Sequence, residues 1–443
     1  MMVMLAYSAP VAAAAANTCR AKNLTQGTPS RSDLQATINA AHRGDKIVVR
    51  GICVGSFRFD TNLALVGRPT PGRAMPVLHG EQGAGHVVRV EARMTLTNLK
   101  VTGGAANTGG VRSGDAGGGI RVSHAGALTL NRSVVSGNRA AYMGGGIANY
   151  GRLTLNSAVV VGNRAGVKGD ATGRGGGIAN FGWLALNGSS EVRGNQANNT
   201  GGGIENYDVL IMNGTSSVRA NTAELGGGIF LASDRPRYKD PTVTMNDASS
   251  VRGNTAVNDG SGGNGVGGGI LSFNEGTVTL RDSSSVSRNS VPAGGGGGIV
   301  NWFGTMLLED SSSVHDNTGI GIWSRYGSTI LRGSSSVRGN TEGGIFNDEA
   351  AFTLIGSSSV TGNTSENEGA GIVNNGDIVL KESASVFDNT TTSTGGGIHN
   401  QGTVGACDAT SVDEWIGTVE PNAPNDFLDS DVSLISGGTG GCS

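Results

Sequence analysis

The chain of 443 residues has little charge, few aromatic rings and few cysteines. Charged residues make up 15% of it, aromatic residues 5%, and the formal net charge is −3. Nucleic-acid-binding proteins usually carry a basic face, so a nearly neutral chain is not expected to bind nucleic acid. After its N-terminal segment, the chain has no run approaching the about twenty apolar residues of a membrane-spanning helix, so no transmembrane segment is expected in the mature protein.

Sequence signatures of a catalytic or metal site are also absent. The four Cys include no Cys-x-x-Cys pair that would suggest zinc, and the six His are scattered along the chain. Calcium-binding nonapeptides of the type Gly-Gly-x-Gly-x-Asp do not occur. No set of residues therefore identifies a reaction, and whether the protein is an enzyme stays open.

Glycine, in contrast, is abundant, with 77 of the 443 residues, more than twice its average share of about 7%. Collagen would need glycine at every third position, and that period is absent. Disorder would need high net charge and few β-branched residues, whereas Val and Ile recur throughout the chain. The glycines therefore indicate a folded backbone with many tight bends.

The two ends of the chain suggest export and cross-linking. Residues 1–16 are small and apolar and end in an Ala-x-Ala pattern, which is typical of a signal peptide; a disordered Ala-rich tail is the alternative. The four Cys form one pair near each end, which predicts two disulfides, Cys19–Cys53 and Cys407–Cys442. We therefore expect a secreted or cell-surface protein whose disulfides clamp the ends of its fold.

Three short phrases recur along the chain at intervals as short as 23 residues. The first is the tetrad Gly-Gly-Gly-Ile or a close variant, which we call the glycine tetrad, with its Ile at Ile120, Ile147, Ile178, Ile204, Ile229, Ile270, Ile299, Ile322, Ile345, Ile372 and Ile398. The second is Val-x-x-Asn, with its Asn at Asn138, Asn163, Asn195, Asn221, Asn254, Asn289, Asn317, Asn340, Asn363 and Asn389. The third is a short apolar strand such as Leu-Thr-Leu at 128–130. Such periodic self-similarity is the signature of a repeat architecture.

Each repeat holds three short segments that can stack on the same segment of the next repeat, about 4.8 Å away. Runs of Gly disfavour helical repeats, and a propeller blade needs about 40–45 residues. The sequence therefore predicts an all-β fold, a single right-handed parallel β-helix of about eleven coils or slightly more. We expect the Ile, Val and Leu of the three phrases to point inward. The recurring Asn are expected to occupy left-handed bends and to form hydrogen-bonded ladders.

The ends of this array are expected to be irregular, as terminal repeats usually are. Residues 17–104 are interpreted as an N-terminal cap with early coils. They include a short capping helix over residues 33–42, in which Ser32 opens a capping box. Regular repeats then cover residues 105–402, and residues 403–443 form a C-terminal capping tail.

The combination of a hydrophobic-x-x-Asn phrase with Gly-Gly-x-Ile resembles the repeat of the polymorphic outer-membrane-protein family, over about residues 95–402. Those proteins carry Phe-x-x-Asn and Gly-Gly-Ala-Ile in β-helical domains, and several are adhesins. This chain has Val where that family has Phe. More broadly, the chain resembles pectate-lyase-like β-helix proteins, many of which act on or bind polysaccharides, but it lacks the Asp-Asp and Gly-His-Gly signatures of polygalacturonases.

One column of the predicted stack contains three carboxylates on successive coils, Asp247, Asp282 and Asp310. Like charges about 5 Å apart repel one another, and a cation between them lowers that cost. Calcium takes several carboxylate oxygens, so a Ca²⁺ site is one hypothesis. The alternative is turn chemistry, because the same column holds Gly in other coils and Gly and Asp interchange where a turn needs an unusual backbone angle.

Two further columns are candidate ligand-binding sites. Three residues after the tetrad Ile comes a column of rings: Tyr150, Phe181, Tyr207, Phe273 and Trp302. These rings either hold sugar rings or stack on one another to stabilise the turn. One residue after the Val lies a basic column: Arg193, Arg219 and Arg252. It either pairs with an acidic glycan or is a solvated face.

The function expected from these patterns is adhesin-like binding of extracellular polysaccharide or of a surface protein. One alternative is a polysaccharide lyase or glycoside hydrolase acting on an acidic polysaccharide. The other is a structural envelope protein with no specific ligand.

Overall fold

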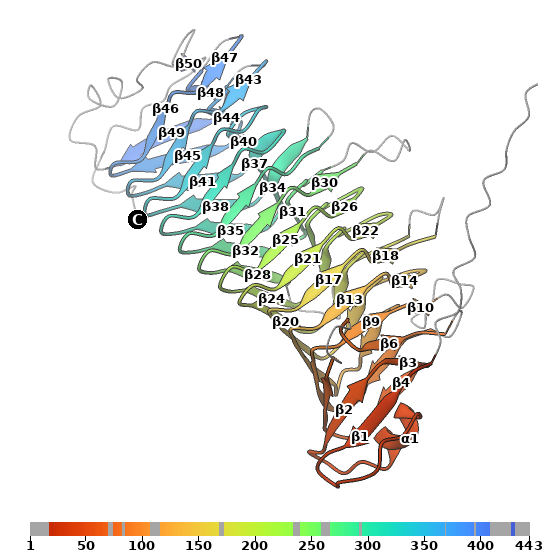
Figure 1. The fold of residues 1–443 in the computed structure, drawn as a ribbon. Coiled ribbons are helices and arrows are strands. Elements are labelled where there is room, and N and C mark those ends of the chain that lie inside the picture. The colour runs from red at the N-terminus through yellow and green to blue at the C-terminus, as the bar shows by residue number, and fades with distance from the viewer. Residues whose placement is uncertain are drawn as a thin grey trace, which may run out of the picture.

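The computed structural model is a single parallel β-helix, built from stacked coils (Figure 1). It describes residues 17–69, 74–81, 85–106, 116–167, 172–233, 240–257, 266–291, 295–367, 369–393, 396–407 and 427–429. The predicted signal, residues 1–16, lies outside this part of the chain. The fold class predicted from the repeats is confirmed.

Three long sheets form the sides of the stack, and one strand of each belongs to every regular coil. Sheet A comprises β1 (Arg20–Asn23), β2 (Lys46–Arg50), β5 (Leu63–Gly67), β8 (Arg93–Thr97), β12 (Ala127–Asn131), β16 (Arg152–Asn156), β20 (Trp183–Asn187), β24 (Val209–Met212), β28 (Thr242–Met245), β32 (Thr277–Leu280), β35 (Thr305–Leu308), β38 (Ser328–Leu331), β41 (Ala351–Leu354), β45 (Asp377–Lys381) and β49 (Thr403–Cys407). Sheet B comprises β3 (Ile52–Val54), β6 (Val77–His79), β9 (Lys100–Thr102), β13 (Val134–Ser136), β17 (Val159–Val161), β21 (Glu191–Arg193), β25 (Ser217–Arg219), β29 (Ser250–Arg252), β33 (Ser285–Ser287), β36 (Ser313–His315), β39 (Ser336–Arg338), β42 (Ser359–Thr361) and β46 (Ser385–Phe387).

Sheet C contains the tetrad Ile residues. It comprises β4 (Phe57–Phe59), β7 (Val88–Val90), β11 (Ile120–Val122), β15 (Ile147–Asn149), β19 (Ile178–Asn180), β23 (Ile204–Asn206), β27 (Ile229–Ala232), β31 (Ile270–Phe273), β34 (Gly296–Trp302), β37 (Ile320–Arg325), β40 (Ile345–Asp348), β44 (Ile372–Asn374), β48 (Ile398–Asn400) and β50 (Phe427–Asp429). Two smaller sheets lie after sheet B in the coil. Sheet D comprises β10 (Ala105–Ala106), β14 (Arg139–Ala140), β18 (Arg164–Ala165), β22 (Gln196–Ala197), β26 (Thr222–Ala223) and β30 (Thr255–Ala256), and the other pairs β43 (Thr364–Ser365) with β47 (Thr390–Thr391).

The core is a set of inward columns, as the repeat phrases predict. On one coil, Ile204 of sheet C, Leu210 and Met212 of sheet A and Val218 of sheet B are fully buried. Each lies in register with its counterpart on the next coil; Ile204, for example, pairs with Ile229. Burying such a side chain contributes about 1.5–3 kcal/mol, so stacked apolar columns supply the main stabilisation of the coil.

The Asn of the Val-x-x-Asn phrase form the expected ladder, but not in the expected conformation. Asn221 donates from Nδ2 to Asn254 Oδ1 at 2.9 Å and to the Val192 carbonyl at 2.9 Å. The left-handed residue is the one before each Asn, such as Gly194 (φ 59°) or Ala220 (φ 52°). The prediction of left-handed Asn was therefore wrong: the preceding residue makes the bend, and the Asn turns inward to satisfy buried backbone groups.

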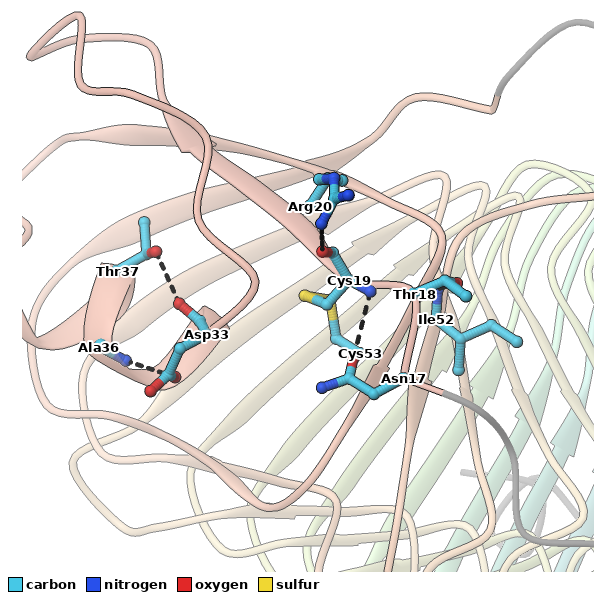
Figure 2. Close-up of a disulfide and its surroundings, with 9 residues drawn as sticks. All are labelled: Asn17, Thr18, Cys19, Arg20, Asp33, Ala36, Thr37, Ile52 and Cys53. Atoms are coloured by element: carbon cyan, nitrogen blue, oxygen red, sulfur yellow. Dashed lines mark hydrogen bonds between the residues drawn. A yellow bond between two sulfur atoms is a disulfide. The ribbon is translucent and has the colours of Figure 1, made fainter.

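The N-terminal end is closed by β1, which pairs antiparallel with β2, and by the six-residue helix α1 (Leu34–Asn39). This helix is shorter than predicted, and its first turn is capped by Asp33, whose carboxylate accepts the Ala36 N–H at 2.9 Å (Figure 2). The prediction of a capping box that opens at Ser32 was therefore wrong, because the N-cap is the next residue, Asp33.

The predicted disulfide Cys19–Cys53 is present and ties the start of the chain to β3 (Figure 2). The other predicted pair, Cys407 and Cys442, lies outside the residues whose side chains the structure describes. At the C-terminal end, β49 and β50 continue sheets A and C beyond residue 402, where the tail was expected to begin.

Candidate functional site

The outer face of sheet C carries two columns of outward side chains. In the first column, Glu205 is in register with Ala179 on the preceding coil and with Phe230 on the following coil. A row of residues just before the glycine tetrads, including Arg174 and Thr200, is linked from coil to coil by β-bridges. Side chains of this row pack over the first column, so several of its outward residues are buried.

The second column contains the predicted rings, and three of them form a stacked file. The Tyr150 and Phe181 ring centroids are 4.9 Å apart, and the Phe181 and Tyr207 centroids 4.5 Å apart, with nearly parallel planes. The Arg121 guanidinium lies 4.7 Å from the Tyr150 centroid. These contacts occupy the faces of the rings, which is the stabilising role that the sequence left open for them.

A buried carboxyl group, Glu205, lies at the end of this file. Its side chain is fully buried between one apolar cluster that includes Met143 and Ala179 and another that includes Phe230 and Leu271. An ionisable group in such a stripe is unusual, because charged side chains are rarely fully buried unless paired.

All of the polar contacts of the Glu205 side chain are made by one carboxyl oxygen. Glu205 Oε1 accepts hydrogen bonds from Tyr207 Oη at 2.8 Å and from Thr200 Oγ1 at 3.0 Å, and lies 3.9 Å from Arg174 Nη1. Arg174 Nη1 also donates to Tyr207 Oη at 3.1 Å. Oε2 is buried without a hydrogen-bond partner among the described residues.

Burial raises the pKa of Glu205 to about 7, although Arg174, Tyr207 and Thr200 each lower it. Burial likewise raises the pKa of Tyr207, with a further contribution from the charge of Glu205. A carboxyl group with such a pKa exchanges its proton near neutral pH, and perturbed groups of this kind mark candidate functional sites. Because Glu205 is fully buried, its carboxyl oxygens do not face a surface ligand, and their polar neighbours are Thr200, Tyr207 and Arg174.

The rings farther along sheet C are arranged differently. After a gap at Ala232, Phe273 and Trp302 meet edge to face at 5.7 Å, and Trp302 meets Trp323 edge to face at 5.9 Å. Phe273 is 36% exposed. The faces of Phe273, Trp302 and Trp323 are therefore not covered by stacking on one another.

Two further rings next to this cluster were not predicted. Phe303 and Tyr326 follow sheet C on successive coils and stack on each other, with ring centroids 5.2 Å apart and planes 29° apart, and the Arg325 guanidinium lies 4.8 Å from the Tyr326 centroid. Even so, Phe303 is 48% exposed and Tyr326 42%. Both adopt left-handed backbone angles, with φ of 61° and 53°, which bulky residues rarely adopt. We call Phe273, Trp302, Phe303, Trp323 and Tyr326 the exposed aromatic cluster.

The predicted basic column does not join these rings. Arg193, Arg219 and Arg252 lie on sheet B, a different side of the coil. Glu191 neutralises two of them: it lies 2.8 Å from Arg193 Nε and accepts two-pronged hydrogen bonds from Arg219 at 3.0–3.2 Å. The structure therefore divides the predicted ligand-binding residues between two surfaces.

The three Asp of the carboxylate column adopt left-handed turns, with φ between 55° and 57°. Each carboxylate accepts the backbone N–H of the preceding coil: Asp247 from Gly214 at 2.7 Å, Asp282 from Asp247 at 2.7 Å, and Asp310 from Asp282 at 3.0 Å. These contacts are those of turn residues, which was the alternative to a calcium site. In the part of the chain that the structure describes, no three His, Cys, Asp or Glu are gathered as a metal site.

Comparisons with known proteins assign no family. No family model matches the chain, no curated protein matches it, and no solved structure matches it. None of the helices in the described ranges is both long and apolar enough to cross a membrane. What is established is thus the parallel β-helix itself and the surfaces that its columns create.

Proposed function

We propose that this protein is a secreted or cell-surface carbohydrate-binding β-helix, adhesin-like in role, that holds an extended polysaccharide along the outer face of sheet C. The observation that carries this proposal is the exposed aromatic cluster. Sugar rings pack on exposed aromatic faces, and coils about 4.8 Å apart present such faces at regular spacing along a chain. The resemblance to pectate-lyase-like β-helices agrees with a polysaccharide ligand.

The backbone at two of these rings supports a functional role. Phe303 and Tyr326 keep left-handed conformations that cost about 1–2 kcal/mol for a side chain with a Cβ atom, and both rings remain largely exposed. The same turn is left-handed at Glu349 on the next coil (φ 50°), so the turn imposes this conformation and the two ring residues bear its cost. Gly or Asn would fold there at lower cost, so exposure combined with strain favours ligand contact.

Binding is favoured over catalysis because the most perturbed carboxyl group is inaccessible. A glycoside hydrolase needs two carboxyl groups flanking the scissile bond, whereas Glu205 is fully buried beneath Arg174 and Tyr207. Among the described residues, the carboxyl group with the strongly raised pKa is thus not placed to protonate a sugar oxygen, which favours binding over hydrolysis.

The test is calorimetric titration with neutral and acidic polysaccharides, in parallel with an assay for newly released sugar ends. The double variant Phe303→Asn, Tyr326→Asn removes both rings while suiting the left-handed backbone. The control is Leu24→Ser, which removes an apolar side chain of the N-terminal region that is 38% exposed. We expect the double variant to lose at least tenfold in affinity and the control to bind normally. Equal binding by both variants, or release of sugar ends, would contradict the proposal.

A further inference from the structure

Charge is distributed unevenly along the stack. Residues 1–219 contain 22 of the 32 Lys and Arg but only 10 of the 35 Asp and Glu. The first half of the chain therefore has a net charge of +12 and the second half −15, although the total is −3. A field of this size attracts anions to the N-terminal coils and raises the rate at which an anionic partner associates.

Within the basic half, two adjoining hollows share the same two arginines. The first, of about 280 Å³, is lined by Arg139, Arg164, Gln196 and the bends at Gly137, Gly162 and Gly194. The second, of about 450 Å³, extends from Arg139 and Arg164 toward Val167. We call this surface the arginine groove; it follows the corner between sheet B and the short sheet D.

The register of sheet D brings these arginines close together. Arg139 of β14 pairs with Arg164 of β18, which pairs in turn with Gln196 of β22. Neighbouring strands lie about 4.8 Å apart, so the two guanidinium side chains start one strand spacing from each other. Like charges at this distance repel, and an anion bound between them removes that cost.

No described carboxylate neutralises the groove. Arg139 is exposed and its guanidinium makes no hydrogen bond or ion pair within the described residues, and the guanidinium of Arg164 donates only to the amide oxygen of Asn198 at 3.1 Å. No Asp or Glu is among the lining residues. On sheet B, by contrast, Arg193 and Arg219 share Glu191. The arginines of the groove therefore differ from those two arginines of the basic column in having no carboxylate partner among the described residues.

We propose that the arginine groove binds a linear acidic polysaccharide, with its carboxylate or sulfate groups held by Arg139 and Arg164. Planar guanidinium groups match both kinds of oxyanion with two parallel hydrogen bonds. The uncovered backbone at the glycine bends and the Gln196 amide suit the hydroxyl groups of a sugar chain. A single-stranded nucleic acid would need rings on which bases stack, and the lining residues include none.

This surface is separate from the exposed aromatic cluster, which lies on other coils and along another sheet. The inference therefore does not rest on the proposed function. A ligand that binds only the cluster is unaffected by Arg139 and Arg164, and a ligand held only by the groove is unaffected by Phe303 and Tyr326.

The experiment measures binding of polygalacturonate, dextran sulfate and neutral dextran by calorimetry at low and moderate salt. The test variant is Arg139→Gln, Arg164→Gln. The matched control, Arg288→Gln, Arg338→Gln, removes two exposed arginines from the acidic half. We expect binding of at least one acidic polymer, weakened by salt and by at least tenfold in the test variant. The control should change that binding by less than twofold.

Several outcomes would overturn the inference. The first is equal affinity of the test variant and the wild type for the acidic polymers. The second is binding of neutral dextran that the test variant weakens as much as it weakens binding of the acidic polymers, which would remove the role of charge. The third is tighter binding of single-stranded DNA than of either acidic polysaccharide. The fourth is a dimer of this chain, seen by ultracentrifugation, that the test variant dissociates, since the acidic half of a second copy would then be the occupant.

Discussion

The substitution Glu205→Gln should stabilise the protein at neutral and alkaline pH but not in acid. The folded protein holds the carboxyl group with its pKa raised to about 7, against an ordinary value of 4.5. Between these two values the folded chain keeps a proton that the unfolded chain releases. Stability therefore falls as pH rises from about 4.5 to 7 and is constant with respect to this group above that range.

The size of the effect follows from the shift. Each pH unit of difference corresponds to about 1.36 kcal/mol, so the loss between pH 4.5 and 7 amounts to about 3 kcal/mol. Gln has nearly the same shape and carries no charge at any pH, so the variant escapes this loss. At pH 8 it should exceed the wild type by up to about 3 kcal/mol, and at pH 4 the two should agree to within about 1 kcal/mol.

The assay is urea denaturation across pH 4–8, with hydrogen exchange of the amides in β19, β23 and β27 to localise the effect. Local measurement matters because a repeat array need not unfold in one step. Glu191→Gln is the matched control, since its half-exposed carboxylate pairs with Arg193 and Arg219. Removing that charge should lower stability by less than about 1 kcal/mol. If Glu205→Gln has the same pH dependence as the wild type, the assignment of a buried, protonated carboxyl group is wrong.

Three further changes test other parts of the structure. Phe303→Asn with Tyr326→Asn should keep thermal stability within about 1 kcal/mol of the wild type, because relief of left-handed strain offsets the lost ring stacking; a larger loss would show that the rings serve the fold. Cys19→Ser with Cys53→Ser should lower the stability of the N-terminal coils by about 4 kcal/mol, from the 34-residue loop that the disulfide closes, with faster hydrogen exchange in β1 to β3; unchanged exchange would contradict this. Asn221→Ala should cost about 3 kcal/mol or more in urea denaturation, since it leaves buried groups on two coils without partners, and a cost below about 1 kcal/mol would refute the ladder's role.

The coil was predictable because its inward columns repeat. The Ile of each glycine tetrad, like the Asn three residues after each Val, can contact its counterpart only if the coils stack. The structure pairs Ile147 with Ile178 in this way. The helix boundary and its cap were less predictable because each occurs once. The Asn bends were misjudged because two adjacent residues compete for the left-handed position, and the preceding one, often Gly, adopts it at lower cost.

The buried carboxyl group was missed because its environment comes from other coils. Arg174 and Thr200 precede the glycine tetrads of two coils, and their approach to Glu205 depends on how that row packs over sheet C. One signal was available in the sequence: Ile204-Glu205-Asn206 interrupts a column in which Ala148 and Ala179 occupy the same place. Phe303 and Tyr326 were not predicted because they lie one residue beyond the predicted column of rings, and the sequence does not reveal their backbone angles.

The outward columns are free to diversify because each coil contacts only its neighbours. A change on the surface of one coil leaves the inward Ile, Leu and Val of that coil in register, so a ring cluster, a basic groove and a buried carboxyl group can coexist on one frame. Glu205 is the exception that links surface to core, because Arg174 and Tyr207 cover an outward position and remove it from water. Ionisation of Glu205 should therefore change the stability of the coils that contain β19, β23 and β27. The exposed rings at Phe303 and Tyr326, more than two coils away, should respond to ligand independently of it.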